Sequence, residues 1–141
     1  MGTDVGHEVL PAMALRLITS EDPRSLRLET FCDALTRLRP DLDVRRLHEG
    51  GQALPRLVLP GGVRYIGVPE GQETAPFEDA VSGRLPLPPP RLSERLASLR
   101  LPAELNLYVS SRCTFCPLAV RSLVPLAAAQ PRLRLAIVDA E

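Results

Sequence analysis

A chain of 141 residues with 45% apolar side chains can form one compact domain or two very small ones, each with a real core. Its 17 basic residues are all arginine and are balanced by 17 acidic residues, so neither nucleic acid nor a membrane surface is an expected partner. The absence of lysine excludes Schiff-base chemistry and a P-loop lysine. We expect a cytoplasmic protein, because the N-terminus does not resemble a secretory signal and no apolar run approaches roughly 18 residues.

The first half of the chain begins with an α/β pattern after a polar N-terminal arm at residues 1–12. Residues 13–18 alternate as a strand, and "TSEDP" then supplies helix-capping residues, with Pro23 at an early helical position. The helix continues to Pro40 because apolar side chains recur at helical spacing: Leu28, Phe31, Cys32, Leu35 and Leu38. Residues 41–47 predict a second strand, parallel to the first.

A hairpin and one more helix complete this first unit, which we place at residues 13–84. "RLVLPGGVRYIGVP" indicates two strands joined by a turn at Gly61 and Gly62. "GQETAPFEDAVSG" then predicts a helix with Phe77, Ala80 and Val81 on one face and Gly83 as its C-cap.

A proline-rich linker at residues 85–90 separates this unit from a second, partial one at residues 91–141. The second unit repeats the order helix, strand, helix, strand in "RLSERLASLR", "AELNLYV", "CPLAVRSLVPLAAAQ" and "RLRLAIVDAE". Its central helix is expected to form despite Pro125.

The sequence "SSRCTFCPLAV" places two of the three cysteines between a predicted strand and a predicted helix. Cys113 lies at the positive end of the helix dipole, near unpaired backbone N–H groups and Arg112, which favours a thiolate. A thiolate attacks disulfides, and a second thiol three residues later resolves the mixed disulfide. We therefore predict a thiol–disulfide oxidoreductase in which Cys113 is the catalytic nucleophile and Cys116 the resolving thiol, with no metal and no organic cofactor.

Two other interpretations of the cysteine pair remain open. A lone Cys-x-x-Cys is half of a zinc site, which Cys32 with His7 or His48 would have to complete. The cysteines could also be purely structural, in a non-catalytic adaptor that docks a partner protein. Cys32 itself lies on the apolar stripe of its helix, where we expect it to be buried and to take no part in chemistry.

The segment "LSERLASLRLPAELNLYVSSRCTFCPLAV" resembles the active unit of the tandem thioredoxin-fold proteins. These are the glutaredoxin-like protein disulfide oxidoreductases and the N-terminal domain of the alkyl hydroperoxide reductase flavoprotein. The segment "ALPRLVLPGGVRYIGVPEGQETAPFEDAV" resembles the hairpin and last helix of the first unit, with Pro55 where that fold has a cis-proline. The resemblance implies a three-layer α/β/α thioredoxin-like fold, with one complete degenerate unit and the N-terminal half of a second.

The resemblance also implies a division of labour and a set of partners. The junction "TSEDPRS" of the first unit has no cysteines, so that unit is redox-inactive and the second carries the chemistry. Electrons would come from a thioredoxin-reductase-type flavoprotein and pass to protein disulfides, those of a peroxiredoxin among them. The chain has no Gly-x-Gly-x-x-Gly fingerprint for a flavin or nucleotide of its own.

The second unit departs from the family pattern, because a further helix, a proline-led hairpin and a closing helix do not follow residue 141. The strand at 105–109 would then have an unpaired edge. We expect either that the chain is a piece of a longer protein, or that this edge is covered by the first unit or by a second copy in a homo-oligomer.

Overall fold

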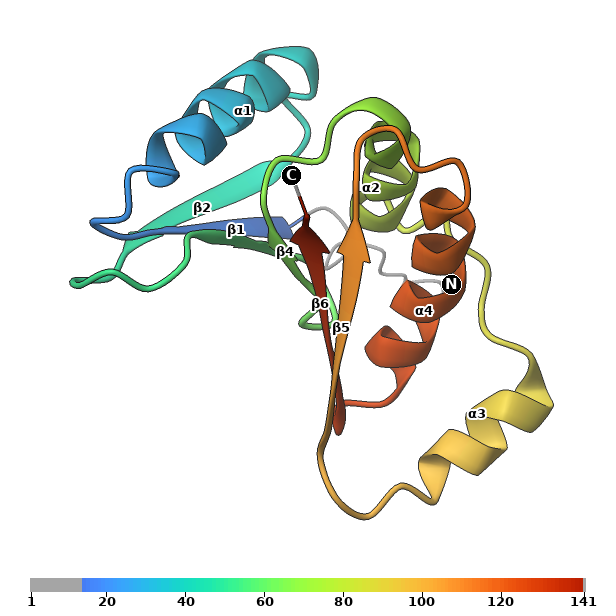
Figure 1. Cartoon of the computed structure of the whole chain (residues 1–141). Coiled ribbons are helices and arrows are strands. Elements are labelled where there is room, and N and C mark those ends of the chain that lie inside the picture. The colour runs from blue at the N-terminus through green and yellow to red at the C-terminus, as the bar shows by residue number, and fades with distance from the viewer. Residues whose placement is uncertain (1–13, 141) are drawn as a thin grey trace, which may run out of the picture.

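The computed structural model describes residues 14–140 and shows two groups of strands that share one sheet (Figure 1). The arm at 1–12 with His7, together with Met13 and Glu141, lies outside the described residues. The elements, in chain order, are β1 (Ala14–Thr19), α1 (Ser25–Leu38), β2 (Asp43–His48), β3 (Arg56–Val58), β4 (Arg64–Ile66), the 3-10 turn η3 (Gly71–Glu73), α2 (Thr74–Val81), α3 (Pro90–Ala97), β5 (Ala103–Val109), α4 (Cys116–Ala129) and β6 (Leu133–Asp139).

The first unit forms as the apolar spacing predicts. Strands β1 and β2 pair in parallel, and α1 buries Leu28, Cys32 and Leu35 on one face. The start of α1 differs from the expectation, because Pro23 lies two residues before the helix. Asp22 still stabilises the turn before the helix, because its Oδ1 accepts a hydrogen bond from the Arg24 backbone N–H at 2.9 Å.

The predicted hairpin is confirmed, with β3 and β4 antiparallel. Gly61 and Gly62 have φ values of 87° and 88°, in the left-handed region that glycine adopts at little cost. The family resemblance implied a cis peptide bond before Pro55. That expectation is wrong, because no peptide bond in the described part of the chain is cis.

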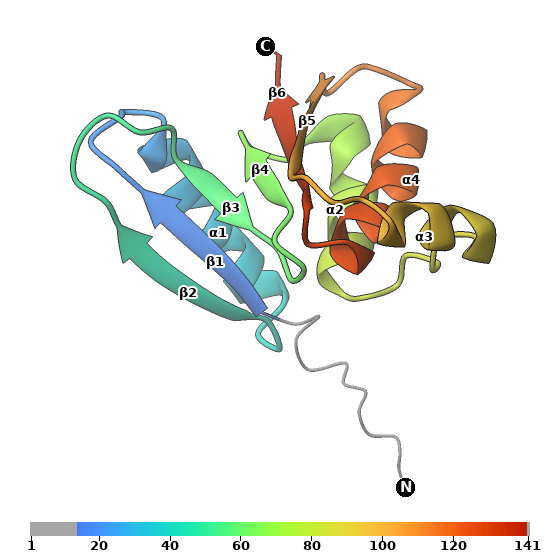
Figure 2. The ribbon, with the colours of Figure 1, turned by 90° about the horizontal axis from the view of Figure 1, so that it is seen from below.

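One continuous sheet joins both halves of the described chain, in the order β2-β1-β3-β4-β6-β5 (Figure 2). The two halves meet where β4 pairs with β6 in parallel, a contact between residues about 70 positions apart. One row of side chains crosses five strands by register and faces the shared core: Leu17, Leu57, Tyr65, Ile137 and Leu107. The side chains buried by α1, α2 and α4 meet this same core.

The segment that connects the two halves of the described chain lies on the surface. Helix α3 follows the prolines at 86, 88 and 89, begins at Pro90 and buries none of its residues, and Leu87 is 90% exposed. The Gln130 side chain ties α3 to the end of α4 by donating to the Leu96 carbonyl oxygen at 2.7 Å. Within residues 14–140, no helix has both the length and the apolar character needed to span a membrane.

Candidate functional site

The cysteine loop, residues 110–115, runs from the end of β5 to the start of α4. Ser110 organises its first turn, because its carbonyl oxygen accepts the Cys113 N–H and its Oγ accepts the Arg112 N–H, each at 3.2 Å. The strand before the loop is held by Ala140, whose N–H donates to the Val109 carbonyl oxygen at 2.8 Å. The loop therefore leaves a fixed strand with a defined backbone turn.

Cys113 and Cys116 form a disulfide, with their Cα atoms 5.4 Å apart. The two sulfur-bearing residues differ in exposure, since Cys116 is 9% exposed and Cys113 is only half-buried. The residues between them, Thr114 and Phe115, are exposed. An approaching molecule therefore meets Cys113 before it meets Cys116.

Helix α4 begins at Cys116, so Cys113 lies three residues before the helix, in the loop, and is linked to its first residue by the disulfide. Pro117 fits this first turn, where its missing N–H would have no intrahelical partner. Cys116 belongs to the buried stripe of α4 with Val120 and Val124, and this packing anchors the second thiol. Pro125 lies inside α4, as expected.

Glu73 is a buried carboxylate beside the cysteine loop, and the sequence interpretation did not identify it. It ends η3, where the neighbouring Gln72 N–H donates to the Ser111 carbonyl oxygen at 2.9 Å. Glu73 is 3% exposed, and neither carboxyl oxygen has a hydrogen-bond partner. Burial raises the pKa of this carboxyl above its usual range.

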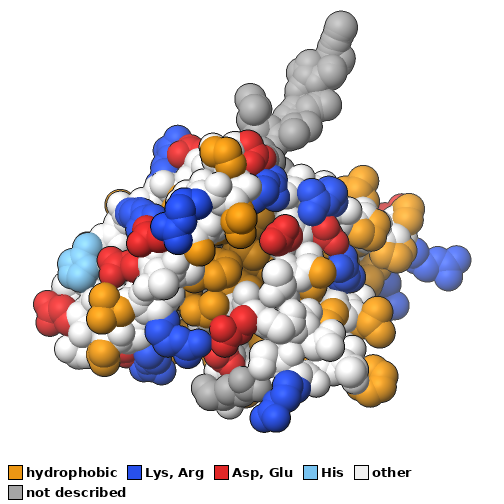
Figure 3. Space-filling model, turned by 90° about the horizontal axis from the view of Figure 1, so that it is seen from above, with side chains coloured by type: hydrophobic (Ala, Val, Ile, Leu, Met, Phe, Trp, Pro, Cys, Tyr) orange, Lys and Arg blue, Asp and Glu red, His pale blue; other side chains and the backbone are white. Residues whose placement is uncertain are grey.

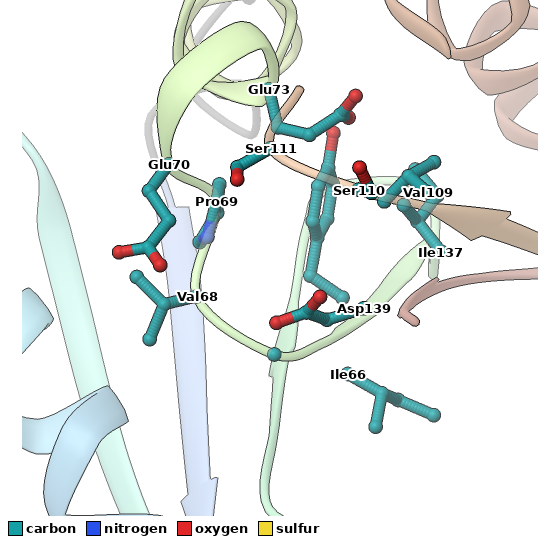
Figure 4. Close-up of a pocket in the computed structure, with 12 residues that line it drawn as sticks. Ile66, Val68, Pro69, Glu70, Glu73, Val109, Ser110, Ser111, Ile137 and Asp139 are labelled. Carbon is teal, nitrogen blue, oxygen red and sulfur yellow. The ribbon is translucent and has the colours of Figure 1, made fainter. Parts of the chain in front are cut away.

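A cavity of about 10 Å³ connects Glu73 to the cysteine loop (Figure 4). Ser110, Ser111 and Asp139 line it together with Glu73, and the figure shows these side chains around one small space. Its volume is at the lower limit for one water molecule. The buried carboxyl and Ser110 and Ser111, the first two residues of the cysteine loop, thus border the same small space.

Tyr65 forms a further wall of this cavity. Its hydroxyl is also buried without a hydrogen-bond partner, and burial together with the Glu73 charge raises its pKa. The Tyr65 ring packs edge-on against Phe77, with centroids 5.2 Å apart. The Tyr65 ring is therefore held by aromatic packing, while its hydroxyl has no hydrogen-bond partner.

A sequence signal for Glu73 exists, because it lies four residues before Phe77 and eight before Val81. This spacing puts all three on one helical face, and Phe77 and Val81 are 1% exposed. A charged residue on the buried stripe of a predicted helix is unusual enough to mark a candidate site.

In the first unit, the equivalent junction between β1 and α1 has serine hydroxyl groups in hydrogen bonds where the second unit has thiols. Ser25 begins α1 as Cys116 begins α4, and its Oγ accepts the Ser20 N–H at 2.9 Å and donates to the Ser20 carbonyl oxygen at 3.0 Å. Asp22 pairs with Arg24 at 2.6 Å, which lowers the pKa of Asp22 to about 2. These contacts fix the loop without any thiol.

His7 of the zinc interpretation lies outside the described residues, and the described members of that interpretation do not form a metal-binding group. Cys32 is fully buried, as expected, and burial raises its thiol pKa to about 11. His48 is exposed at the end of β2, with Nδ1 2.9 Å from the Thr19 Oγ1. Among residues 14–140, no three His, Cys, Asp or Glu side chains are grouped so that they could hold a metal ion.

No protein-family model matches the chain, and no curated protein matches it in sequence. Solved structures do match. The NTD_N/C domain of alkylhydroperoxide reductase AhpF from Enterococcus faecalis superposes with a TM-score of 0.70 at 20% identity, over 89% of this chain and 70% of that one. The C503A mutant of AhpF from the same organism gives a TM-score of 0.69 at 19% identity, over 94% and 76% of the two chains.

A third match is Sso1120 from Sulfolobus solfataricus, with a TM-score of 0.63 at 20% identity over 93% of this chain and 76% of that one. At such low identity the similarity establishes the fold alone. The first unit, β1 to α2, is complete, and the part from α3 to β6 repeats the front of such a unit with the cysteine pair. The chain therefore has the thioredoxin-like α/β fold of the AhpF N-terminal domain.

Proposed function

We propose that this protein is a thiol–disulfide oxidoreductase in which Cys113 is the nucleophile and Cys116 the resolving thiol. The observation that carries the proposal is the disulfide between a half-buried Cys113 and a buried Cys116 at the start of α4. A dithiol with one accessible member, at a helix N-terminus, is the arrangement that disulfide exchange requires.

The reaction begins with the reduced protein. The Cys113 thiolate attacks one sulfur of a substrate disulfide, forms a mixed disulfide and releases the other substrate sulfur as a thiolate, which takes up a proton. Cys116 then loses its proton and attacks the Cys113 sulfur, which releases the second substrate sulfur as a thiolate that also takes up a proton. Two electrons and two protons have moved to the substrate, and the Cys113–Cys116 disulfide remains. The N–H groups that begin α4 and the Arg112 guanidinium favour the Cys113 thiolate.

Glu73 has the properties of a proton carrier for the second step. Cys116 is only 9% exposed, so bulk water has little access to its thiol. The helical turn that contains Glu73 contacts α4, and its carboxyl borders the cavity next to the cysteine loop. Because burial raises its pKa, this carboxyl can accept a proton closer to neutral pH than an exposed one. We include Glu73 in the proposed site as the acceptor of the Cys116 proton.

The proposed partners follow from the fold neighbours. Two of them are forms of an alkylhydroperoxide reductase. We propose by analogy that a flavoprotein reductase of the thioredoxin-reductase type reduces the Cys113–Cys116 disulfide, and that the dithiol reduces protein disulfides such as those of a peroxiredoxin. A reducing cytoplasm is the compartment in which this direction of electron flow operates.

Trapping of the mixed disulfide tests the proposal. A Cys116→Ser protein is incubated with a peptide that contains one disulfide, and covalent adducts are measured by intact mass. We expect an adduct on Cys113 in this variant, none in Cys113→Ser, and an unchanged result when Cys32→Ser is added to either. Equal labelling of both single variants, or of neither, would contradict the assigned roles and favour a non-catalytic adaptor.

A further inference from the structure

Two buried polar side chains from the first unit border the cavity beside the cysteine loop (Figure 4). Glu73 ends η3, and Tyr65 is the middle residue of β4; they are 3% and 2% exposed. Both carboxyl oxygens of Glu73 and the Tyr65 hydroxyl are buried without a hydrogen-bond partner among residues 14–140. Buried polar atoms in folded proteins are nearly always hydrogen-bonded. Three such atoms at one cavity therefore indicate that they share a partner there.

The size of the cavity fits a partner of one water molecule. The Tyr65 hydroxyl and the Glu73 carboxyl are not within hydrogen-bond distance of each other. The cavity that both line has a volume of about 10 Å³, which is the room that a single water needs. A buried water also needs two to four polar partners, and these two side chains provide them. A water in this place can accept a hydrogen bond from the phenol and donate one to the carboxylate.

Tyr65 has the properties of a permanent hydrogen-bond donor. Burial, together with the Glu73 charge, raises the pKa of the Tyr65 hydroxyl above its usual range, so this group keeps its proton at any physiological pH. The same observation shows that the two side chains are close enough to interact electrostatically. The packing of the Tyr65 ring against Phe77 fixes the position from which the hydroxyl donates.

We propose that Tyr65 is a positioning residue for Glu73: its hydroxyl donates to one water molecule bound in this cavity, and that water donates to the Glu73 carboxylate. A carboxylate that accepts such a hydrogen bond is stabilised in its charged form. Glu73 is then ionised in more of the molecules near neutral pH, and an ionised Glu73 is the form that can take the Cys116 proton. This role in catalysis rests on the proposed function, whereas the bridge between the two side chains does not.

Other charged groups also surround the cavity. Asp139 of β6 and the 51% exposed Glu70 line it, and Arg121 of α4 acts on Tyr65 while it pairs with Asp79 of α2 at 2.5 Å. On the face above the carboxyl ends of β5 and β6, basic and acidic side chains lie next to one another around a centre of apolar ones (Figure 3). All these charges are the same in the wild type and in Tyr65→Phe, so a comparison of the two isolates the hydroxyl.

Removal of this one hydroxyl group tests the proposal. The oxidised protein, with its disulfide intact, is labelled with ¹³C at the glutamate carboxyl carbons, and the Glu73 Cδ resonance is followed by NMR from about pH 4 to about pH 9. Glu73→Gln identifies the resonance. The proteins compared are the wild type, Tyr65→Phe and the matched control Tyr108→Phe, which loses a hydroxyl from a side chain that is 63% exposed. Tyr65→Phe keeps the aromatic ring that packs against Phe77, so we expect it to fold.

We expect the Glu73 titration midpoint to rise by about one pH unit in Tyr65→Phe and to keep its wild-type value in Tyr108→Phe. A crystal structure of the oxidised protein should show one water within hydrogen-bond distance of both the Tyr65 hydroxyl and the Glu73 carboxyl. A midpoint that stays the same or falls in Tyr65→Phe would overturn the proposal, and so would a crystal structure without that water.

The titration is independent of the proposed function, because it involves no thiol chemistry. A failed titration with successful trapping of the mixed disulfide would overturn the role of Tyr65 alone. A successful titration with failed trapping would overturn the oxidoreductase and leave the bridge between the two side chains in place.

Discussion

Replacement of Glu73 by Gln changes how the stability of this protein depends on pH. The folded state binds the Glu73 proton more tightly than the unfolded state, because burial raises the pKa of this carboxyl above its ordinary value of 4.5. Above that pH the unfolded state releases the proton first, so rising pH lowers the free energy of unfolding until the folded-state pKa is passed. One proton contributes a slope of at most about 1.4 kcal/mol per pH unit.

The assay is urea unfolding of the wild type and Glu73→Gln at a series of values from about pH 4 to about pH 8. The difference in free energy of unfolding between the two proteins cancels the titration of all other groups. We expect Glu73→Gln to gain stability relative to the wild type as the pH rises above 4.5, and to level off above the folded-state pKa. Glu70→Gln is the matched control, three residues away with a carboxylate that is 51% exposed.

A pH-independent difference between wild type and Glu73→Gln would refute the reasoning, because the carboxyl would then not be titrating in a buried site. A gain of the same size and pH dependence in Glu70→Gln would refute it as well, since it would reflect net charge and not burial.

Three further outcomes are expected. Cys32→Ser should lower the free energy of unfolding by about 1 to 3 kcal/mol, measured in urea, because a buried hydroxyl replaces an apolar thiol, and should leave the redox titration unchanged. Gly71→Ala should destabilise the fold and alter the reactivity of Cys113 toward an alkylating reagent, because Gly71 has φ of 61° and its added Cβ would meet the Ser111 carbonyl oxygen. Reduction of the Cys113–Cys116 disulfide should lower the thermal midpoint, since closing so short a loop contributes about 2 kcal/mol.

Local elements were predictable because their signals are local. The helical spacing of Leu28, Cys32 and Leu35 and the glycine pair at 61–62 specify α1 and the hairpin without reference to the rest of the chain. The strand-to-helix position of the cysteine pair is a further local signal.

Contacts between the two halves were not predictable in this way. The pairing of β4 with β6 depends on a match between short strands far apart in sequence, for which the local pattern carries no information. It also determines that β5 and not β6 is the last strand of the sheet formed by residues 14–140. The cavity beside Glu73 is of the same kind, because residues of β5, β6 and the cysteine loop line it together with a turn that precedes them in the chain. The spacing of Glu73 with Phe77 and Val81 marks it as a candidate for burial, but only the contacts between the two halves place it beside the thiols.

The central claim is that Cys113 and Cys116 are a reversible redox pair, and a redox titration tests it most directly. The purified protein is equilibrated in graded thiol buffers, alkylated and measured by intact mass, with Cys32→Ser and Cys113→Ser as companions. The account predicts that two thiols interconvert together, with one midpoint that survives Cys32→Ser and disappears in Cys113→Ser. Three thiols that remain alkylatable across the whole range, or release of zinc in place of a disulfide, would contradict it.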